Sequence, residues 1–185
     1  MAIKGLSQQI EPQHLGYEEI YERNINVSVT KISDNLMRTK ASLLDLNHNM
    51  RVDLVVQVST RTILDVNCQM VKTPFEICGI TRHRAQQLIG LKIERGVTKQ
   101  IHAILGGPSG CTHLYELTVE AIRMSSNVMM GFATGDEKEW RERRMTDEEF
   151  IQRARGFLKD SCLPFSAKRG SVGVSACGDF ASTVA

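Results

Sequence analysis

Two cysteines and a histidine stand where loops lead into predicted helices. Cys78 follows an extended segment, and Cys111 and His113 lie in "GGPSGCTHLYELTVEAI", residues 106–122, where a glycine-rich loop precedes an apolar periodic segment. At a helix start the first backbone N–H groups are unpaired and the helix dipole is positive, which favours the thiolate form of a cysteine. The thiolate is the form that binds metal ions and attacks electrophiles. These three side chains are therefore the first candidates for chemistry.

An acidic residue completes the candidate set. Asp45 ends an extended segment and is followed by the turn-forming residues Asn47, His48 and Asn49. A carboxylate at such a place could close a metal site with sulfur and nitrogen ligands, and this ligand mixture suits zinc or iron. We interpret the other histidines, including His48, as ordinary polar or solvent-facing side chains. The candidate metal ligands are thus Asp45, Cys78, Cys111 and His113.

The cysteine count and the charge narrow the class of protein. The chain has five cysteines, an odd number with no CxxC pair, which favours free thiols in a reducing compartment. No secretory signal and no apolar segment of roughly 20 residues is found, so we expect a cytoplasmic protein that is not embedded in a membrane. The formal charge of +2 is too small to indicate nucleic acid as a partner.

Alternating apolar residues predict the strands that position Asp45. "NINVSVT" and "RTKASLLDLNHN" are extended segments, and "VDLVVQVS" followed by "TILDVNCQMV" predicts an antiparallel hairpin. In the second strand of this hairpin we place Leu64, Val66 and Cys68 on the buried face and Ile63 on the other. Cys68 is then most simply a small buried hydrophobic residue.

Helical periodicity begins after Pro74. We predict a short helix from Thr81 to Gly90, a second over 97–105, and a third and longer one from Leu114 to Val128. One further helix is expected beyond Gly135, where Thr146 and the three acidic residues after it form a plausible helix start before an apolar stretch.

The order of these elements predicts an α+β fold. An antiparallel β meander of three or more strands is followed by helices that pack on one face of the sheet. We expect residues 1–22 to form an N-terminal extension, residues 23–165 a single domain, and residues 166–185 a flexible tail rich in small and polar residues.

Between Thr39 and Arg123 the sequence resembles the NifU-type scaffold proteins of iron-sulfur cluster assembly. "MRVDLVVQVSTRTILDVNCQMVKTPFEICGI" resembles the central hairpin and the cysteine after it, and "CTHLYELTVEAI" resembles the last ligand-bearing helix. The resemblance implies the same four ligands and a bound zinc, iron or iron-sulfur cluster. Leu43 and Leu44 stand where that family has its first cysteine, which shifts the expectation toward a mononuclear metal.

A second resemblance covers more of the chain. "LGGPSGCTHLYEL" is similar to a bacterial family of unknown function that is marked by a "GCTHL" motif, and the similarity extends over roughly residues 20 to 165. This resemblance implies no particular activity.

Three functional hypotheses follow from the sequence. The first is a protein that binds zinc, iron or an iron-sulfur cluster through Asp45, Cys78, Cys111 and His113. The second is an enzyme of acyl or thioester transfer with a cysteine nucleophile and His113 as its base, although no third residue that orients the base can be named. The third is a regulatory or binding module with structural cysteines, which contacts a protein partner or a second copy of itself.

Overall fold

The structure, a computed structural model, describes residues 20–134, 138–139, 142, 144–162 and 165–166. These residues fall into two compact units, one that ends at Met130 and one that begins at Gly131, and each is described by itself. Residues 1–19 of the predicted extension and 167–185 of the predicted tail lie outside the described residues, and the predicted domain of residues 23–165 stays a prediction.

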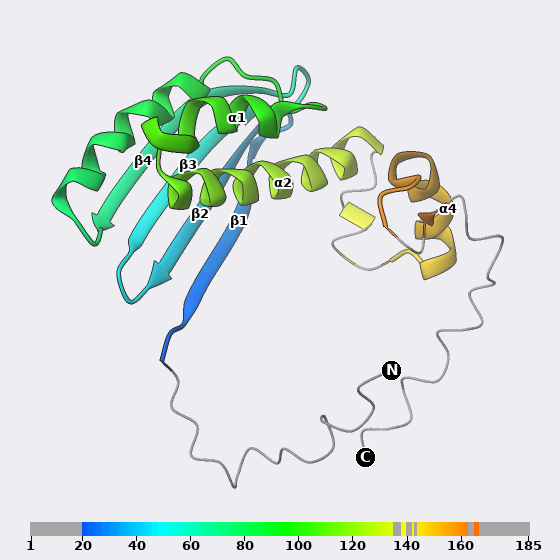
Figure 1. The fold of residues 1–185 in the computed structure, drawn as a ribbon. Helices are drawn as coiled ribbons and strands as arrows, with labels where there is room; N and C mark the ends of the chain where they lie inside the picture. Colours follow the sequence, from blue (N-terminus) through cyan, green and yellow to red (C-terminus); the bar gives the residue numbers. More distant parts are fainter. Residues whose placement is uncertain (1–19, 135–137, 140–141, 143, 163–164, 167–185) are drawn as a thin grey trace, which may run out of the picture. The chain divides into compact units, whose positions relative to one another are not determined.

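The first unit is built on a four-stranded antiparallel sheet. Its strands are β1 (Arg23–Ser33), β2 (Leu36–Asp45), β3 (Asn49–Gln57) and β4 (Thr62–Lys72), in the order β1-β2-β3-β4. The helical elements that follow are η1 (Glu76–Leu88), α1 (Val97–Leu105), η2 (Gly107–Ser109) and α2 (Thr112–Thr134). In Figure 1, α1 and α2 lie across the same face of the sheet. The predicted α+β fold with an antiparallel meander is confirmed.

Strict alternation along the strands produces the one-sided core. In β2 and β3 every second side chain is buried against the helices, while those between them face the other side of the sheet. The largest fully buried side chains come from both strands and helices: Met37, Leu43, Met50, Leu54, Ile63, Leu88, Ile101, Leu105, Leu114 and Leu117.

The predicted hairpin of β3 and β4 is confirmed, but the face assigned to one of its residues is wrong. The register shifts between Val55 and Val56, so that Val56 pairs with Ile63 rather than with Leu64. This irregularity turns Ile63 into the core and leaves Leu64 44% exposed. A single extra residue reverses the two faces, and alternation read from the sequence does not reveal it.

The first helical element also differs from the prediction. η1 is a 3-10 helix that begins at Glu76, five residues before the expected start at Thr81, and Cys78 lies in its first turn. Ala85 and Leu88 are buried, whereas Ile89 lies beyond the helix and is 43% exposed. The 3-10 geometry has three residues per turn, so it does not keep the apolar residues on the stripe that a 3.6-residue period predicts.

A buried pair of hydroxyl groups joins α2 to the sheet. Ser125 Oγ donates to the carbonyl oxygen of Ala121 at 2.8 Å and lies 2.7 Å from Thr39 Oγ1 on β2. Because the single hydroxyl proton of Ser125 is used by Ala121, Thr39 is the donor to Ser125. Both side chains are fully buried, so this bond fixes where α2 crosses β2.

A tight glycine turn sets the start of α2. The N–H of Cys111 donates to the carbonyl oxygen of Leu105 at 2.8 Å and so closes the connection between α1 and α2. A Cβ atom on Gly110 would lie 1.9 Å from that same oxygen, a distance at which the backbone must move. Gly110 is therefore required by the close approach of two backbone segments.

The second unit contains the helix α4 (Asp147–Leu158), which begins with a capping box. The Thr146 side chain accepts a hydrogen bond from the N–H of Glu149, and the Glu149 carboxylate accepts one from the N–H of Thr146. This confirms the helix start predicted at Thr146. No described helix of either unit has the length and apolar character needed to cross a membrane.

The glycine turn gives a first prediction. Gly110→Ala should lower the free energy of unfolding by about 2 to 3 kcal/mol, because the new methyl group overlaps a backbone oxygen that cannot rotate away. Gly79→Ala is the matched control, since a Cβ there meets nothing within 4 Å, and it should change stability by less than about 1 kcal/mol. Urea denaturation measures both values; equal stability of the two variants would contradict the steric account.

Candidate functional site

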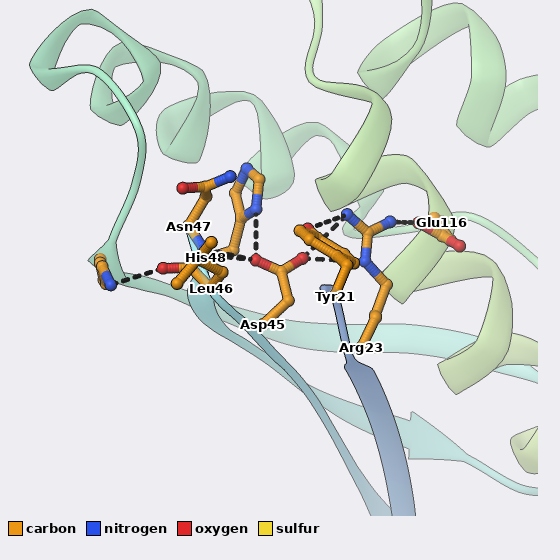
Figure 2. Close-up of polar contacts among 8 residues, drawn as sticks. Tyr21, Arg23, Asp45, Leu46, Asn47, His48 and Glu116 are labelled. Carbon is orange, nitrogen blue, oxygen red and sulfur yellow. Dashed lines mark hydrogen bonds and ion pairs between the residues drawn. The ribbon is translucent and has the colours of Figure 1, made fainter. Parts of the chain in front are cut away.

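Asp45 organises the turn between β2 and β3. Its Oδ1 atom accepts hydrogen bonds from the backbone N–H of Asn47 at 2.8 Å and of His48 at 2.7 Å, and lies 2.9 Å from the Nδ1 atom of His48 (Figure 2). Aspartate at the first position of such a turn commonly replaces a backbone acceptor in this way. The turn therefore directs the His48 ring back over the Asp45 carboxylate.

The second oxygen of Asp45 connects the turn to β1 and α2. Asp45 Oδ2 accepts a hydrogen bond from Arg23 Nε at 2.8 Å, and Arg23 Nη1 donates to Glu116 Oε2 of α2 at 3.2 Å (Figure 2). The Asp45 side chain has no solvent-exposed surface, while that of Arg23 is 29% exposed. Three elements distant in sequence meet at this carboxylate.

The Asp45 carboxylate stays ionised well into the acidic range. Burial by itself raises the pKa of Asp45, but hydrogen bonds from the side chains of His48 and Tyr21 and from two backbone N–H groups outweigh it. The result is a pKa well below the usual range for aspartate. Asp45 is thus a permanent negative charge at neutral pH.

This charge determines which nitrogen of His48 carries a proton. A carboxylate can only accept hydrogen bonds, so the Nδ1 atom of His48 must be the donor. In the neutral imidazole the lone pair is then on Nε2. An oriented imidazole of this kind, backed by a carboxylate, is found in both metal sites and general bases.

A second imidazole contacts the first. The ring of His113, in the first turn of α2, lies with its centroid 3.9 Å from that of His48, at an interplanar angle of 44°. Burial lowers the pKa of His113, and the nearby His48 and Arg23 lower it further, against the opposite effect of Asp45 and Glu116. His113 is therefore neutral at pH 7 and retains a nitrogen lone pair.

A protein family matches the part of the chain that contains this cluster. A protein family described as "Protein of unknown function (DUF2889)" matches residues 21–126, more than half of the chain. The chain belongs to this family. The match runs from the strand that carries Arg23 to the helix that carries His113, so the DUF2889 region contains the whole cluster of Arg23, Asp45, His48 and His113.

Two further comparisons find nothing similar. No curated protein and no solved structure matches the chain significantly. The resemblances to NifU-type scaffolds and to a "GCTHL" family stay predictions.

Cys111 lies close to the imidazole cluster along the chain. It directly precedes α2, and its carbonyl oxygen accepts the first intrahelical hydrogen bond, from the N–H of Tyr115 at 2.9 Å. Its neighbour across the core is Cys68, whose pKa is raised to about 11 by burial and, secondarily, by the charge of Cys111. Both thiols are half-buried.

Cys78 has a different environment from the other predicted ligands. Its N–H donates to the carbonyl oxygen of Phe75 at 3.1 Å, and its own carbonyl oxygen accepts from Thr81 Oγ1 at 2.8 Å. Nothing in the described residues joins its half-buried thiol to Asp45 or His113. Through His48 the structure brings Asp45 and His113 together, with Cys111 two residues from His113, and no contact among the described residues links Cys78 to this cluster.

His48 is the member of the site that the sequence interpretation missed. It is 6% exposed, whereas we expected an ordinary polar histidine. The sequence feature that could have identified His48 is its spacing from Asp45, since the two residues lie three positions apart across the turn that joins β2 and β3.

In the part of the chain that the structure describes, no three His, Cys, Asp or Glu side chains are grouped so that they could hold a metal ion.

The charge of Asp45 gives a second prediction. Asp45→Asn should lower the free energy of unfolding at pH 7 by about 3 kcal/mol, because it leaves Arg23 without its buried partner. Since the pKa of Asp45 is lower in the folded than in the unfolded protein, this stabilisation is complete above the unfolded value of about 4 and is lost as pH falls toward the folded value. The difference between wild type and variant should therefore shrink below about pH 4.

Urea denaturation across pH 2 to 8 measures this difference. Asp53→Asn is the matched control, because it removes a carboxylate that pairs with the half-exposed Arg38. An exposed pair contributes only about 0 to 1 kcal/mol. Equal destabilisation by both substitutions would show that the surroundings of Asp45 are not special.

Proposed function

We propose that this protein binds a single zinc or iron ion through His48 and His113, once a third donor side chain moves to join the two imidazoles. The observation that supports the proposal is the pair of imidazoles in contact, one of which is held at Nδ1 by a buried carboxylate. Histidine ligands of metal ions almost always donate their other ring N–H to such a partner. Asp45 in this proposal orients His48.

The proposal changes the ligand set expected from the sequence. His48 and His113 supply nitrogen, and a further donor comes from Cys111 or from Glu116, which lie two residues before and three residues after His113. Glu116 is already held near the cluster by Arg23, and a change of side-chain rotamer would be needed to complete the ligand set. Cys78 is not required.

The donor types favour a mononuclear ion over a cluster. Imidazole nitrogen with at most one nearby sulfur suits zinc or iron, whereas iron-sulfur clusters are held mainly by several thiolates. An ion with an open coordination position would act as a Lewis acid and activate a bound water molecule. The chain itself orients both imidazole rings and supplies the Asp45 carboxylate, which stays negatively charged because its pKa is lowered.

Zinc titration of the metal-free protein tests the proposal. We expect one zinc ion per chain, with affinity lowered about tenfold or more by His48→Gln and by His113→Gln, and by Asp45→Asn through the lost orientation of His48. His83→Gln is the matched control, since His83 is exposed on η1 and lies outside the cluster. It should leave the affinity unchanged within about twofold.

The Cys78→Ala variant distinguishes the proposed ligand set, which contains His48, from the set expected from the sequence, which contains Cys78. Loss of zinc on this substitution, with no loss on His48→Gln, would contradict the proposal and favour the set expected from the sequence. Failure to bind zinc or iron at one ion per chain would contradict both. Elemental analysis of freshly purified protein identifies the metal that is bound in the cell, and an absorption spectrum distinguishes zinc from an iron-sulfur cluster.

A second candidate function is transfer catalysis with Cys111 as nucleophile. One observation favours it: the Asp45 carboxylate orients His48, which contacts the His113 ring, so His48 would serve as the base in place of the His113 expected from the sequence. Cys111 also lies directly before α2, where the unpaired N–H groups of a helix start can stabilise a thiolate.

Alkylation rates test this candidate. In metal-free protein near neutral pH, iodoacetamide should modify Cys111 at least about tenfold faster than the exposed Cys162, and His48→Gln should abolish the difference. Labelling of Cys111 that is slower than that of Cys162 would contradict a nucleophilic role, because the thiol with less access would then show no activation.

A further inference from the structure

The face of the sheet opposite the imidazole cluster carries a polar cavity. It has a volume of about 430 Å³, within the range of cavities that hold small molecules. Its walls come from all four strands, and none of its lining residues belongs to the helices. The cavity is therefore separate from the cluster at Asp45.

The cavity is built from two neighbouring rows of side chains that cross the sheet. In the first row Ser28, Lys40, Asp53 and Asn67 are paired in register from β1 to β4. Asp53 is already bonded to Arg38, whose guanidinium donates at 2.8 and 2.6 Å. Lys40 consequently has no ion-pair partner among the described residues.

The second row repeats this arrangement two residues further along each strand, on the same face of the sheet. Asn26, Ser42, Arg51 and Gln69 are paired in register, and Arg51 likewise has no anionic partner among the described residues. The two rows together present two cations, three amides, two small hydroxyl groups and the carboxylate of Asp53, which is already paired with Arg38. Antiparallel sheets often have one polar face, but asparagine and aspartate are depleted in strands. Strand formation alone does not account for this composition.

We infer that this cavity binds an anionic, hydroxyl-rich small molecule of the sugar phosphate class. Lys40 and Arg51 would pair with the phosphate, and the amides of Asn26, Asn67 and Gln69 can both donate to and accept from hydroxyl groups. The lining has no aromatic side chain, so it lacks the stacking surface with which single-stranded nucleic acids are bound. The cavity is open to solvent, with Lys40 and Arg51 both exposed, and its volume leaves room for a small molecule.

Calorimetric titration of the full chain with glucose 6-phosphate tests the inference. We expect saturable binding that is weakened about tenfold or more in the double variant Lys40→Gln, Arg51→Gln, which removes both cations. The matched control is Arg95→Gln, Lys99→Gln, which makes the same change in net charge at exposed residues outside the cavity. This control should keep the wild-type affinity within about twofold.

Further titrations separate the parts of the inference. Glucose without phosphate should bind much more weakly, and Asn67→Val should weaken glucose 6-phosphate binding but not the binding of inorganic phosphate. Equal affinity for inorganic phosphate and glucose 6-phosphate would overturn the sugar phosphate assignment, as would equal losses in the two double variants or no saturable binding at millimolar concentrations. His48→Gln should leave this binding unchanged, so failure of the metal proposal and failure of this inference are distinguishable.

Discussion

The buried carboxylate of Asp45 is the interaction on which the candidate metal site depends. A carboxylate without solvent contact is costly unless each oxygen accepts hydrogen bonds, and here the donors come from the β2–β3 turn and from Arg23 on β1. Arg23 in turn reaches Glu116 on α2. The hydrogen bonds that stabilise this buried charge therefore also join β1 to the two elements that carry the imidazoles, the β2–β3 turn and α2.

The proposed metal site and the alternative transfer site use this geometry in the same way. In both, Asp45 fixes the protonated nitrogen of His48 and leaves the Nε2 lone pair for a partner. In the metal site the partner of that lone pair is a metal ion, and in the transfer site it is a proton. The lowered pKa of His113 favours a neutral nitrogen beside the His48 ring, which is an advantage for coordination and of less use to a single general base.

The sheet divides the first unit into two chemically different faces. The side covered by α1 and α2 is apolar, with the Asp45 cluster at its end, and the other side presents two rows of polar side chains around a cavity. Alternation along antiparallel strands makes this separation possible, since neighbouring residues such as Ala41 and Ser42 point to opposite faces. One region of the DUF2889 family thus contains two candidate sites that can be altered independently.

Much of the fold was predictable because it depends on local periodicity. Alternation identified the β3–β4 hairpin, three- and four-residue spacing identified α1 and α2, and the capping residues identified the start of α4. The bulge that buries Ile63 and the 3-10 geometry of η1 escaped prediction, because each changes the period without a distinct composition.

The sequence by itself determined the chemical types at the site, namely a carboxylate in a turn and an imidazole and a thiol at a helix start. Only the tertiary structure decided which of them meet. It placed His48 against His113 and gave Asp45 its partner Arg23, while no contact among the described residues links Cys78 to them. The physical reason is that these contacts join residues 65 and 22 positions apart, and their distances depend on how the elements pack rather than on spacing along the chain.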